Sequence, residues 1–193
     1  IPDRSRPVQR EEARRRLELP EQGPVLLVAG GSLGARALND AVLDAFAETG
    51  PAVLHLTGER EYERVSGRAT RPDYRLLPFT DDYGAALGAA DLVLSRAGGG
   101  VWELAAAGKP AILVPYSLAT ADHQTKNARY FQVAGGAILV PETELGRVPE
   151  IVRSLLDDPR RLAEMGAGMK RVARPNAAEE IAEELITLAA ARG

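Results

Sequence analysis

The sequence predicts an α/β fold, a Rossmann-like, doubly wound parallel sheet of six strands with a helical C-terminal tail. Six short runs of Val, Leu, Ile and Ala recur along the 193 residues, and each run is apolar rather than alternating with polar residues. Such runs are typical of parallel strands that are buried on both faces. Helical spacing separates the runs, and strands that alternate with helices predict a sheet with helices on both sides.

The expected elements follow in chain order. We expect strands at residues 25–29, 52–56, 74–77, 91–94, 111–114 and 137–140. We expect helices between them at residues 36–48, 59–67, 82–89, 101–107 and 123–133. If the strands lie in the common order 3-2-1-4-5-6, the sheet reverses direction between the first and fourth strands, and ligands bind beyond the carboxyl ends of the strands there.

The tail after the sixth strand is expected to be helical, with breaks at Pro159 and at residues 174–176. In its last helix, Ile181, Leu185 and Leu188 recur at helical spacing. We therefore expect one face of this helix to pack against the body of the domain.

Composition narrows the function classes. The formal net charge of −3 offers no basic field for nucleic acid, which is therefore not an expected partner. The absence of cysteine removes disulfides and thiolate chemistry. The two histidines, His55 and His123, are far apart in the sequence, and no Asp-x-Asp pair occurs, so we expect no bound metal ion.

The first expected strand runs into "AGGSLGARALND", residues 29–40. Glycines at the start of a helix let backbone amides face an anion, and we expect Gly31 and Gly34 to do so, with Ser32 adding a hydroxyl. The alternative is a tight turn with Ser32 as the helix N-cap. The loop does not fit G-x-G-x-x-G, and no acidic residue ends the second strand, so a nicotinamide cofactor is not expected.

The fourth expected strand runs into "SRAGGG", residues 95–100, and the helix that follows carries Glu103 in its first turn. An ionised carboxylate only accepts hydrogen bonds, so Glu103 suits a vicinal diol such as that of a ribose. Alternatively, Glu103 complements the helix dipole. Lys109 lies before a proline at a helix end and does not form a P-loop.

The fifth expected strand is followed by "PYSLATADHQTKNARYF", residues 115–131, in which Asp122 is a plausible N-cap. Gln124 and Asn127 are three residues apart on one helical face, and amides that both donate and accept suit a neutral polyol. His123 precedes them and is either a capping or surface residue or a third sugar contact. Together these side chains favour a sugar ligand.

With "GGSLGAR", "SRAGGGVWELAAAGKPAILVP" and "DHQTKNA" in this order, the chain resembles the C-terminal domain of the MurG family of peptidoglycan glycosyltransferases. The resemblance covers nearly all of the chain. It implies one half of a GT-B enzyme, which moves N-acetylglucosamine (GlcNAc) from UDP-GlcNAc to undecaprenyl-pyrophosphoryl-MurNAc-pentapeptide, known as lipid I. It also implies an N-terminal domain that binds lipid I and supplies the catalytic base, no cofactor, and a cytoplasmic enzyme peripheral to the inner face of the cell membrane.

The resemblance also implies roles for single residues. Ser32 would contact the pyrophosphate, the backbone near Thr80 the uracil, and Glu103 the ribose hydroxyls. The remaining implied contacts are Gly99 and Gly100 to the phosphates, Gln124 and Asn127 with the adjacent His123 to the GlcNAc hydroxyls, and Arg4 in the linker to the donor. From Arg96 to Glu103 the loop is one residue shorter than in many relatives, which leaves the pairing of glycines with phosphates open by one position.

Three regions follow from this interpretation: a linker and first helix at 1–20, a nucleotide-sugar-binding domain at 21–175, and its C-terminal helix at 176–193. Two alternatives stay open at this stage. The chain could be a non-catalytic nucleotide-sugar-binding subunit of a two-chain transferase. It could also be a UDP-sugar epimerase-like domain, which would need acid and base carboxylates besides Glu103.

Overall fold

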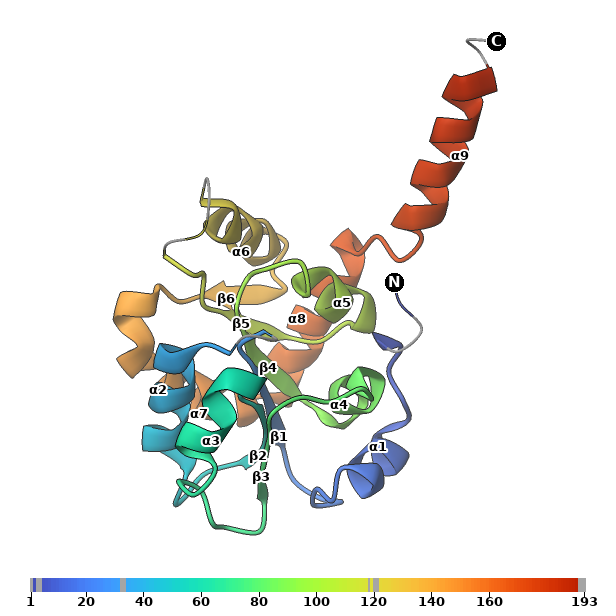
Figure 1. Cartoon of the computed structure of the whole chain (residues 1–193). Helices are drawn as coiled ribbons and strands as arrows, with labels where there is room; N and C mark the ends of the chain where they lie inside the picture. The colour runs from blue at the N-terminus through green and yellow to red at the C-terminus, as the bar shows by residue number, and fades with distance from the viewer. Residues whose placement is uncertain (1, 3–4, 32–33, 118, 120–121, 191–193) are drawn as a thin grey trace.

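The computed structural model describes residue 2 and residues 5–31, 34–117, 119 and 122–190. Its centre is one six-stranded sheet in which every pair of neighbours is parallel, in the order β3-β2-β1-β4-β5-β6 (Figure 1). This confirms the predicted fold class and strand order.

The strands are β1 (Val25–Ala29), β2 (Ala52–Leu56), β3 (Tyr74–Leu77), β4 (Leu92–Ser95), β5 (Ala111–Leu113) and β6 (Ala137–Leu139). The helices up to β6 are α1 (Arg10–Arg16), α2 (Arg36–Phe46), α3 (Glu59–Val65), α4 (Tyr83–Ala89), α5 (Val101–Ala107) and α6 (His123–Val133). The 3₁₀ helix η3 (Glu142–Arg147), α7 (Val148–Leu156), α8 (Pro159–Val172) and α9 (Ala177–Ala190) complete the described chain. Where the expected bounds differ from these, they differ by one or two residues.

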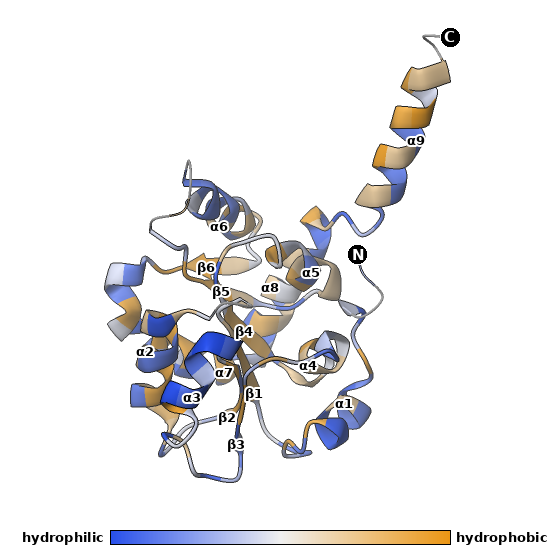
Figure 2. Cartoon of the chain, in the orientation of Figure 1, coloured by the Kyte–Doolittle hydropathy of each residue, from blue (hydrophilic) through white to orange (hydrophobic). Residues whose placement is uncertain are grey.

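Helices cover both faces of the sheet, and a separate hydrophobic cluster fills each side. Val25 and Leu27 of β1 point to the cluster that includes side chains of α4, α5 and α6. Leu26 and Val28 point to the other cluster, with side chains of α2, α3 and α7. Alternate residues of one strand thus enter two different cores, which explains why the strand sequences are apolar throughout. Figure 2 shows the hydrophobic strands between helices with polar outer faces.

The sheet reverses between β1 and β4, which lie side by side with Ala29 opposite Ser95. From β1 the chain continues to β2 and β3 on one side, and from β4 to β5 and β6 on the other. The glycine-rich loops after β1 and β4 therefore start next to each other at the position where open α/β sheets bind ligands.

The last helix, α9, does not pack against the domain, so that expectation is wrong. None of its residues is buried, and the exposed fraction of Leu185 is 61% and that of Ile181 is 57%. Figure 2 shows α9 standing clear of the body, with its hydrophobic and polar sides both exposed. The apolar spacing correctly predicts a helix, but within the described chain no surface covers its apolar face. Among the described residues, no helix combines the length and apolar character needed to cross a membrane.

Candidate functional site

A cavity of about 240 Å³ opens at the carboxyl ends of β1, β2 and β3. Four predicted site residues from three different strand-to-helix connections line it: Gly31 after β1, Thr80 after β3, and, after β4, Gly100 in the loop and Glu103 in the first turn of α5. The other lining residues are Ala29, Leu56, Pro78, Phe79 and Tyr83. The structure thus brings the two glycine-rich loops and the carboxylate of Glu103 together around one space.

Two glycines with positive φ in the loop after β1, Gly31 and Gly34, have different roles. Gly31 has a φ of +94°, and a Cβ added there would meet no atom within 4 Å. Gly34 has a φ of +81°, and a Cβ there would lie 2.5 Å from the carbonyl oxygen of Thr57. The amide of Gly34 donates to the carbonyl of Gly31 at 2.9 Å, so the expectation that this amide faces a ligand is wrong. Gly34 instead closes the turn against the end of β2.

The N-cap position of α2 is held by Ala35, and no side chain caps this helix among the described residues. Ser32, the expected hydroxyl donor and alternative N-cap, lies outside the described residues, as does Arg4. Their expected contacts therefore remain predictions.

The loop before α5 is open at its glycines. An added Cβ at Gly99 or Gly100 would meet no atom within 4 Å, whereas one at Gly98 would lie 4.0 Å from Gln124 Nε2. The three glycine carbonyls accept hydrogen bonds from the first amides of α5, which winds the loop into the helix. Within the described part of the chain, no acceptor pairs with the glycines' own amides. These amides can therefore donate to an anion that approaches the backbone.

Glu103 lies in the first turn of α5, and its Oε2 accepts a hydrogen bond from the Ser5 hydroxyl at 2.7 Å. Tyr83, at the start of α4, lines the same cavity. Burial raises the pKa of Tyr83 well above its ordinary value, and the negative charge of Glu103 adds to this shift. The sequence interpretation missed both Ser5 and Tyr83. Tyr83 follows Asp81 and Asp82 in the segment that leads from β3 into α4. Its place between a strand and the next helix could have marked it as a candidate site residue.

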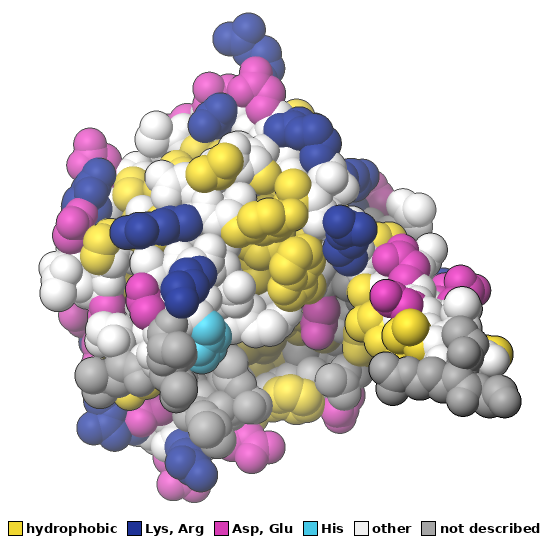
Figure 3. Space-filling model, turned by 90° about the horizontal axis from the view of Figure 1, so that it is seen from above, with side chains coloured by type: hydrophobic (Ala, Val, Ile, Leu, Met, Phe, Trp, Pro, Cys, Tyr) yellow, Lys and Arg dark blue, Asp and Glu magenta, His cyan; other side chains and the backbone are white. Residues whose placement is uncertain are grey.

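The polar face of α6 borders the loop before α5 from the side of β5. Asn127 Nδ2 donates to the carbonyl of Ala97 at 3.0 Å, and Gln124 Oε1 accepts from the amide of Tyr116 at 2.9 Å. Gln124 and Asn127 thus hold the loops after β4 and β5 together. His123, the first residue of α6, is exposed. Figure 3, which looks down from the top of Figure 1, shows a histidine side chain at the surface.

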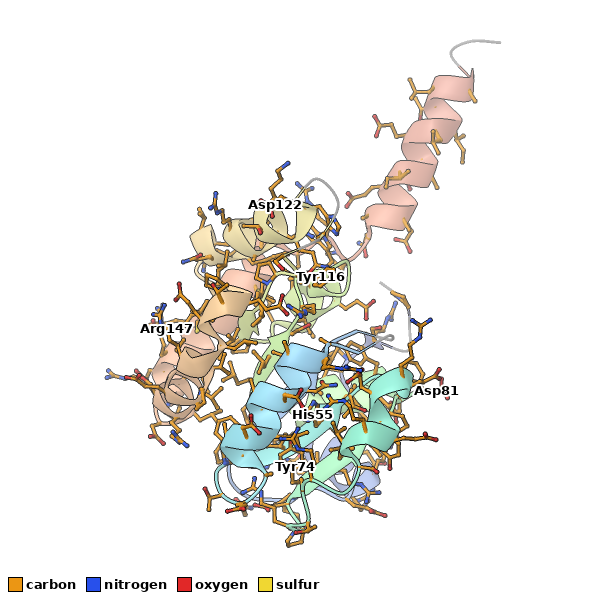
Figure 4. All side chains as sticks on the ribbon, turned by 60° about the vertical axis from the view of Figure 1, so that its left-hand side comes forward. His55, Tyr74, Asp81, Tyr116, Asp122 and Arg147 are labelled. Atoms are coloured by element: carbon orange, nitrogen blue, oxygen red, sulfur yellow. The ribbon has the colours of Figure 1, made fainter. Side chains whose placement is uncertain are left out.

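Asp122 occupies the N-cap position of α6, as expected, with a φ of +54°, but its side chain makes no capping hydrogen bond within the described part of the chain. Residues that cap a helix usually have a backbone in the β region, and the left-handed backbone of Asp122 departs from that conformation. Figure 4 shows Asp122 and Tyr116 at this end of the sheet. By contrast, the side chain of Asp82 does cap α4 by accepting from the amide of Ala85 at 3.1 Å.

Among the described residues, no group of three or more His, Asp or Glu side chains is arranged to hold a metal ion. His55 is fully buried in the core, where its ring nitrogens face Asn39 and Tyr74. His55 therefore has a structural role and does not line the cavity.

Comparison with known proteins places this geometry in a family. The Glycosyltransferase family 28 C-terminal domain matches residues 25–181. Two relatives are named UDP-N-acetylglucosamine--N-acetylmuramyl-(pentapeptide) pyrophosphoryl-undecaprenol N-acetylglucosamine transferase. The protein from Nitratidesulfovibrio vulgaris (strain DP4) is 44% identical over 178 residues, which are 88% of this chain and 49% of that protein. The protein from Halorhodospira halophila is 44% identical over 190 residues, which are 94% of this chain and 53% of that protein.

A solved structure agrees with these matches. The crystal structure of Acinetobacter baumannii MurG superposes with a TM-score of 0.78 and 30% identity, covering 95% of this chain and 55% of that one. The chain spans about half the length of the curated relatives it matches. By its sequence and its fold, this chain belongs to the family of glycosyltransferase family 28 C-terminal domains.

Proposed function

We propose that the chain is the donor-binding half of an inverting GT-B hexosyltransferase that transfers GlcNAc from UDP-GlcNAc to lipid I in peptidoglycan synthesis. The observation that carries the proposal is the single cavity in which Gly31, Gly100 and Glu103 meet at the reversal of the sheet. The names of the relatives, which are 44% identical to this chain, support the same donor and acceptor.

In this proposal, the backbone binds the diphosphate of the donor. The amides of Gly99 and Gly100 have no acceptor among the described residues, and their Cα positions are open to an approaching ligand. Gly31 of the loop after β1 lines the same cavity, with Ser32 as the expected hydroxyl donor. Main-chain amides in fixed positions stabilise the charge that develops as UDP leaves, without having to reorganise.

The nucleoside lies on the opposite wall of the cavity. The backbone near Thr80 contacts the uracil, and the Glu103 carboxylate accepts hydrogen bonds from the ribose diol. Gln124 and Asn127, with His123 beside them, contact the GlcNAc hydroxyls. None of these groups activates the acceptor, so the general base that an inverting transfer requires belongs to the half of the enzyme outside this chain.

The missing half also supplies the remaining partners in this proposal. It binds lipid I, whose undecaprenyl chain resides in the membrane, and so the complete enzyme is cytoplasmic and peripheral to the inner membrane face. We further propose that transfer needs no metal ion or other cofactor, because amides rather than a cation neutralise the diphosphate. Full activity of the two-domain enzyme in excess EDTA would be expected.

The direct test is a thermal-shift titration of the chain with UDP-GlcNAc, UDP-GalNAc, UDP and NAD. Because a ligand stabilises the state that binds it, UDP and UDP-GlcNAc should raise Tm in a saturable manner and NAD should not. Preferential stabilisation by NAD would contradict the proposal.

A second test uses the two-domain enzyme and the variants Ser32→Ala and Glu103→Ala. Removal of one preorganised donor or acceptor is expected to lower kcat/KM for UDP-GlcNAc by about 100-fold, because such groups contribute on the order of 3 kcal/mol at the transition state. Unchanged values of kcat/KM for both variants would contradict the proposed donor site.

A further inference from the structure

Ser5 is a polar side chain that the fold buries almost completely. Its exposed fraction is 2%, and its hydroxyl donates to Glu103 Oε2 at 2.7 Å across a separation of 98 residues. A hydroxyl buried without a partner would be costly, so this hydrogen bond satisfies Ser5 and also occupies one of the two oxygens of Glu103.

Ser5 belongs to an N-terminal segment, described at residue 2 and residues 5–9, that contacts α4 at Val8. The amide of Val8 donates to the carbonyl of Gly84 at 3.1 Å. A Cβ added at Gly88 would lie 2.2 Å from the carbonyl oxygen of Val8, so the segment lies directly on the helix backbone there. The amide of Ser5 also donates to the carbonyl of Pro2 at 2.9 Å. The hydroxyl of Ser5 is therefore presented to Glu103 from a defined backbone position.

The contact has a consequence for the carboxylate. Glu103 is a flexible side chain at the rim of a cavity, and ordering such a side chain costs rotamer entropy when a ligand binds. A carboxylate with one oxygen already held by Ser5 has lost part of that freedom before the ligand arrives. Its other oxygen, and the remaining lone pair of Oε2, stay available as acceptors.

We propose that Ser5 is a positioning residue for the donor site: its hydroxyl orients the Glu103 carboxylate toward the ribose diol. The affinity for the donor then depends on how the N-terminal segment lies against α4. This inference rests on the proposed function, because it needs Glu103 to bind the ribose. Ser5 does not line the cavity. In this inference, it nevertheless changes the affinity for the donor by changing the contact between Glu103 and a ribose hydroxyl.

The test compares the affinities of the chain for UDP and for 2′-deoxy-UDP by isothermal titration calorimetry. The deoxy nucleotide lacks one hydroxyl of the diol, so the ratio of the two Kd values reports the contact with Glu103. We expect Ser5→Ala to weaken UDP by about tenfold, the usual size for a hydrogen bond to a charged group, and 2′-deoxy-UDP by much less. Ser5→Thr keeps the hydroxyl and should restore the wild-type ratio.

Two further variants make the result decisive. Ser66→Ala removes an exposed serine at the end of α3 and should leave both Kd values unchanged. If Ser5→Ala does not fold, Ser5→Cys keeps nearly the same shape with a much weaker donor and should lower the ratio in the same direction.

The outcomes separate the inference from the proposed function. If Glu103→Gln leaves the preference for UDP intact, the proposed function fails at this site. If Glu103→Gln removes the preference but Ser5→Ala does not reduce it, only the positioning role is wrong. Equal weakening of both nucleotides by Ser5→Ala would indicate a structural effect alone, and tighter binding of UDP would show that Ser5 competes with the ribose; either result overturns the inference.

Discussion

Asn39 Oδ1 and His55 Nε2 lie 3.0 Å apart inside the core, where both side chains are fully buried. Asn39 Nδ2 donates to the carbonyl of Thr57, so its oxygen faces His55 and accepts from Nε2. Nδ1 of His55 then accepts from the Tyr74 hydroxyl, 2.8 Å away. Figure 4 shows His55 and Tyr74 in this region. The network satisfies a neutral imidazole and leaves no acceptor for a second proton.

The first prediction concerns pH. Burial lowers the pKa of His55 from 6.5 to about 3 in the folded chain. The unfolded chain therefore binds more protons between these values, and stability is lost as pH falls below about 6.5. Between pH 7 and pH 5 we expect the free energy of unfolding to fall by about 2 kcal/mol from this group. Urea denaturation at both pH values measures it.

His55→Gln is the matching variant for that experiment. It removes the titrating group, so its free energy of unfolding should change little between pH 7 and pH 5, even if it is lower at both. An equal loss of stability in the wild type and in His55→Gln would show that other groups cause the pH dependence.

The second prediction separates glycines that pack from glycines that leave room for a ligand. Gly99→Ala adds a methyl group in open space, so stability should stay within about 0.5 kcal/mol, whereas the affinity for UDP-GlcNAc should fall by about tenfold or more. Gly34→Ala should cost more than about 1 kcal/mol, because the φ is positive and the Thr57 carbonyl is in the way.

Gly67→Ala is the control for those glycine variants, since a Cβ there meets no atom within 4 Å and the residue lies away from the cavity. It should bind UDP-GlcNAc like the wild type. Calorimetry and urea denaturation together decide the comparison: wild-type affinity in Gly99→Ala would mean that no ligand approaches this backbone.

The third prediction concerns Arg14, whose side chain is 1% exposed and pairs with Asp91 at 2.9 Å. Its guanidinium also donates to four backbone carbonyls, those of Ala89, Pro20, Glu21 and Gly23. Arg14→Ala should lower the free energy of unfolding by about 3 to 5 kcal/mol, because it leaves these buried acceptors unpaired. The Arg15→Ala change on the exposed face of α1 should cost less than about 1 kcal/mol. Similar losses for both variants in urea denaturation would contradict the structure.

The fourth prediction compares two leucines. Leu185 of α9 is 61% exposed, whereas Leu155 of α7 is 5% exposed. Leu185→Ala should change the free energy of unfolding of this chain by less than about 0.5 kcal/mol, and Leu155→Ala should lower it by about 2 to 5 kcal/mol. A large loss in Leu185→Ala would show that α9 packs against the domain in solution.

The fold was predictable because burial on both faces leaves a strong local pattern. The runs at 25–29 and 52–56 need no distant information to be recognised as strands, and their order follows from the usual winding of such sheets. The start of β4 was placed one residue early, at Asp91. Its carboxylate accepts from the amide of Val25 and from Arg14, and these partners are more than 60 residues away in the chain.

The site was only partly predictable, for a related reason. Glycine-rich loops at the reversal of the sheet predict an anion-binding site. The sequence alone does not show which glycine leaves room for the ligand and which one packs against the fold. Gly34 supports packing and Gly99 faces open space, and the difference depends on the Thr57 carbonyl. The hydrogen bond from Ser5 to Glu103 joins residues whose relation no local pattern reveals. The missed contacts are thus those that only the folded chain brings together.

The hydrogen bonds of Gln124 and Asn127 to main-chain atoms each use only one end of the side-chain amide. Nε2 of Gln124 and Oδ1 of Asn127 keep their hydrogen-bonding capacity, while the bonds at the other ends fix the planes of both amides. In the proposed reaction, a hexose would therefore meet side chains that are already oriented, and the entropy cost of ordering them would not be subtracted from its affinity.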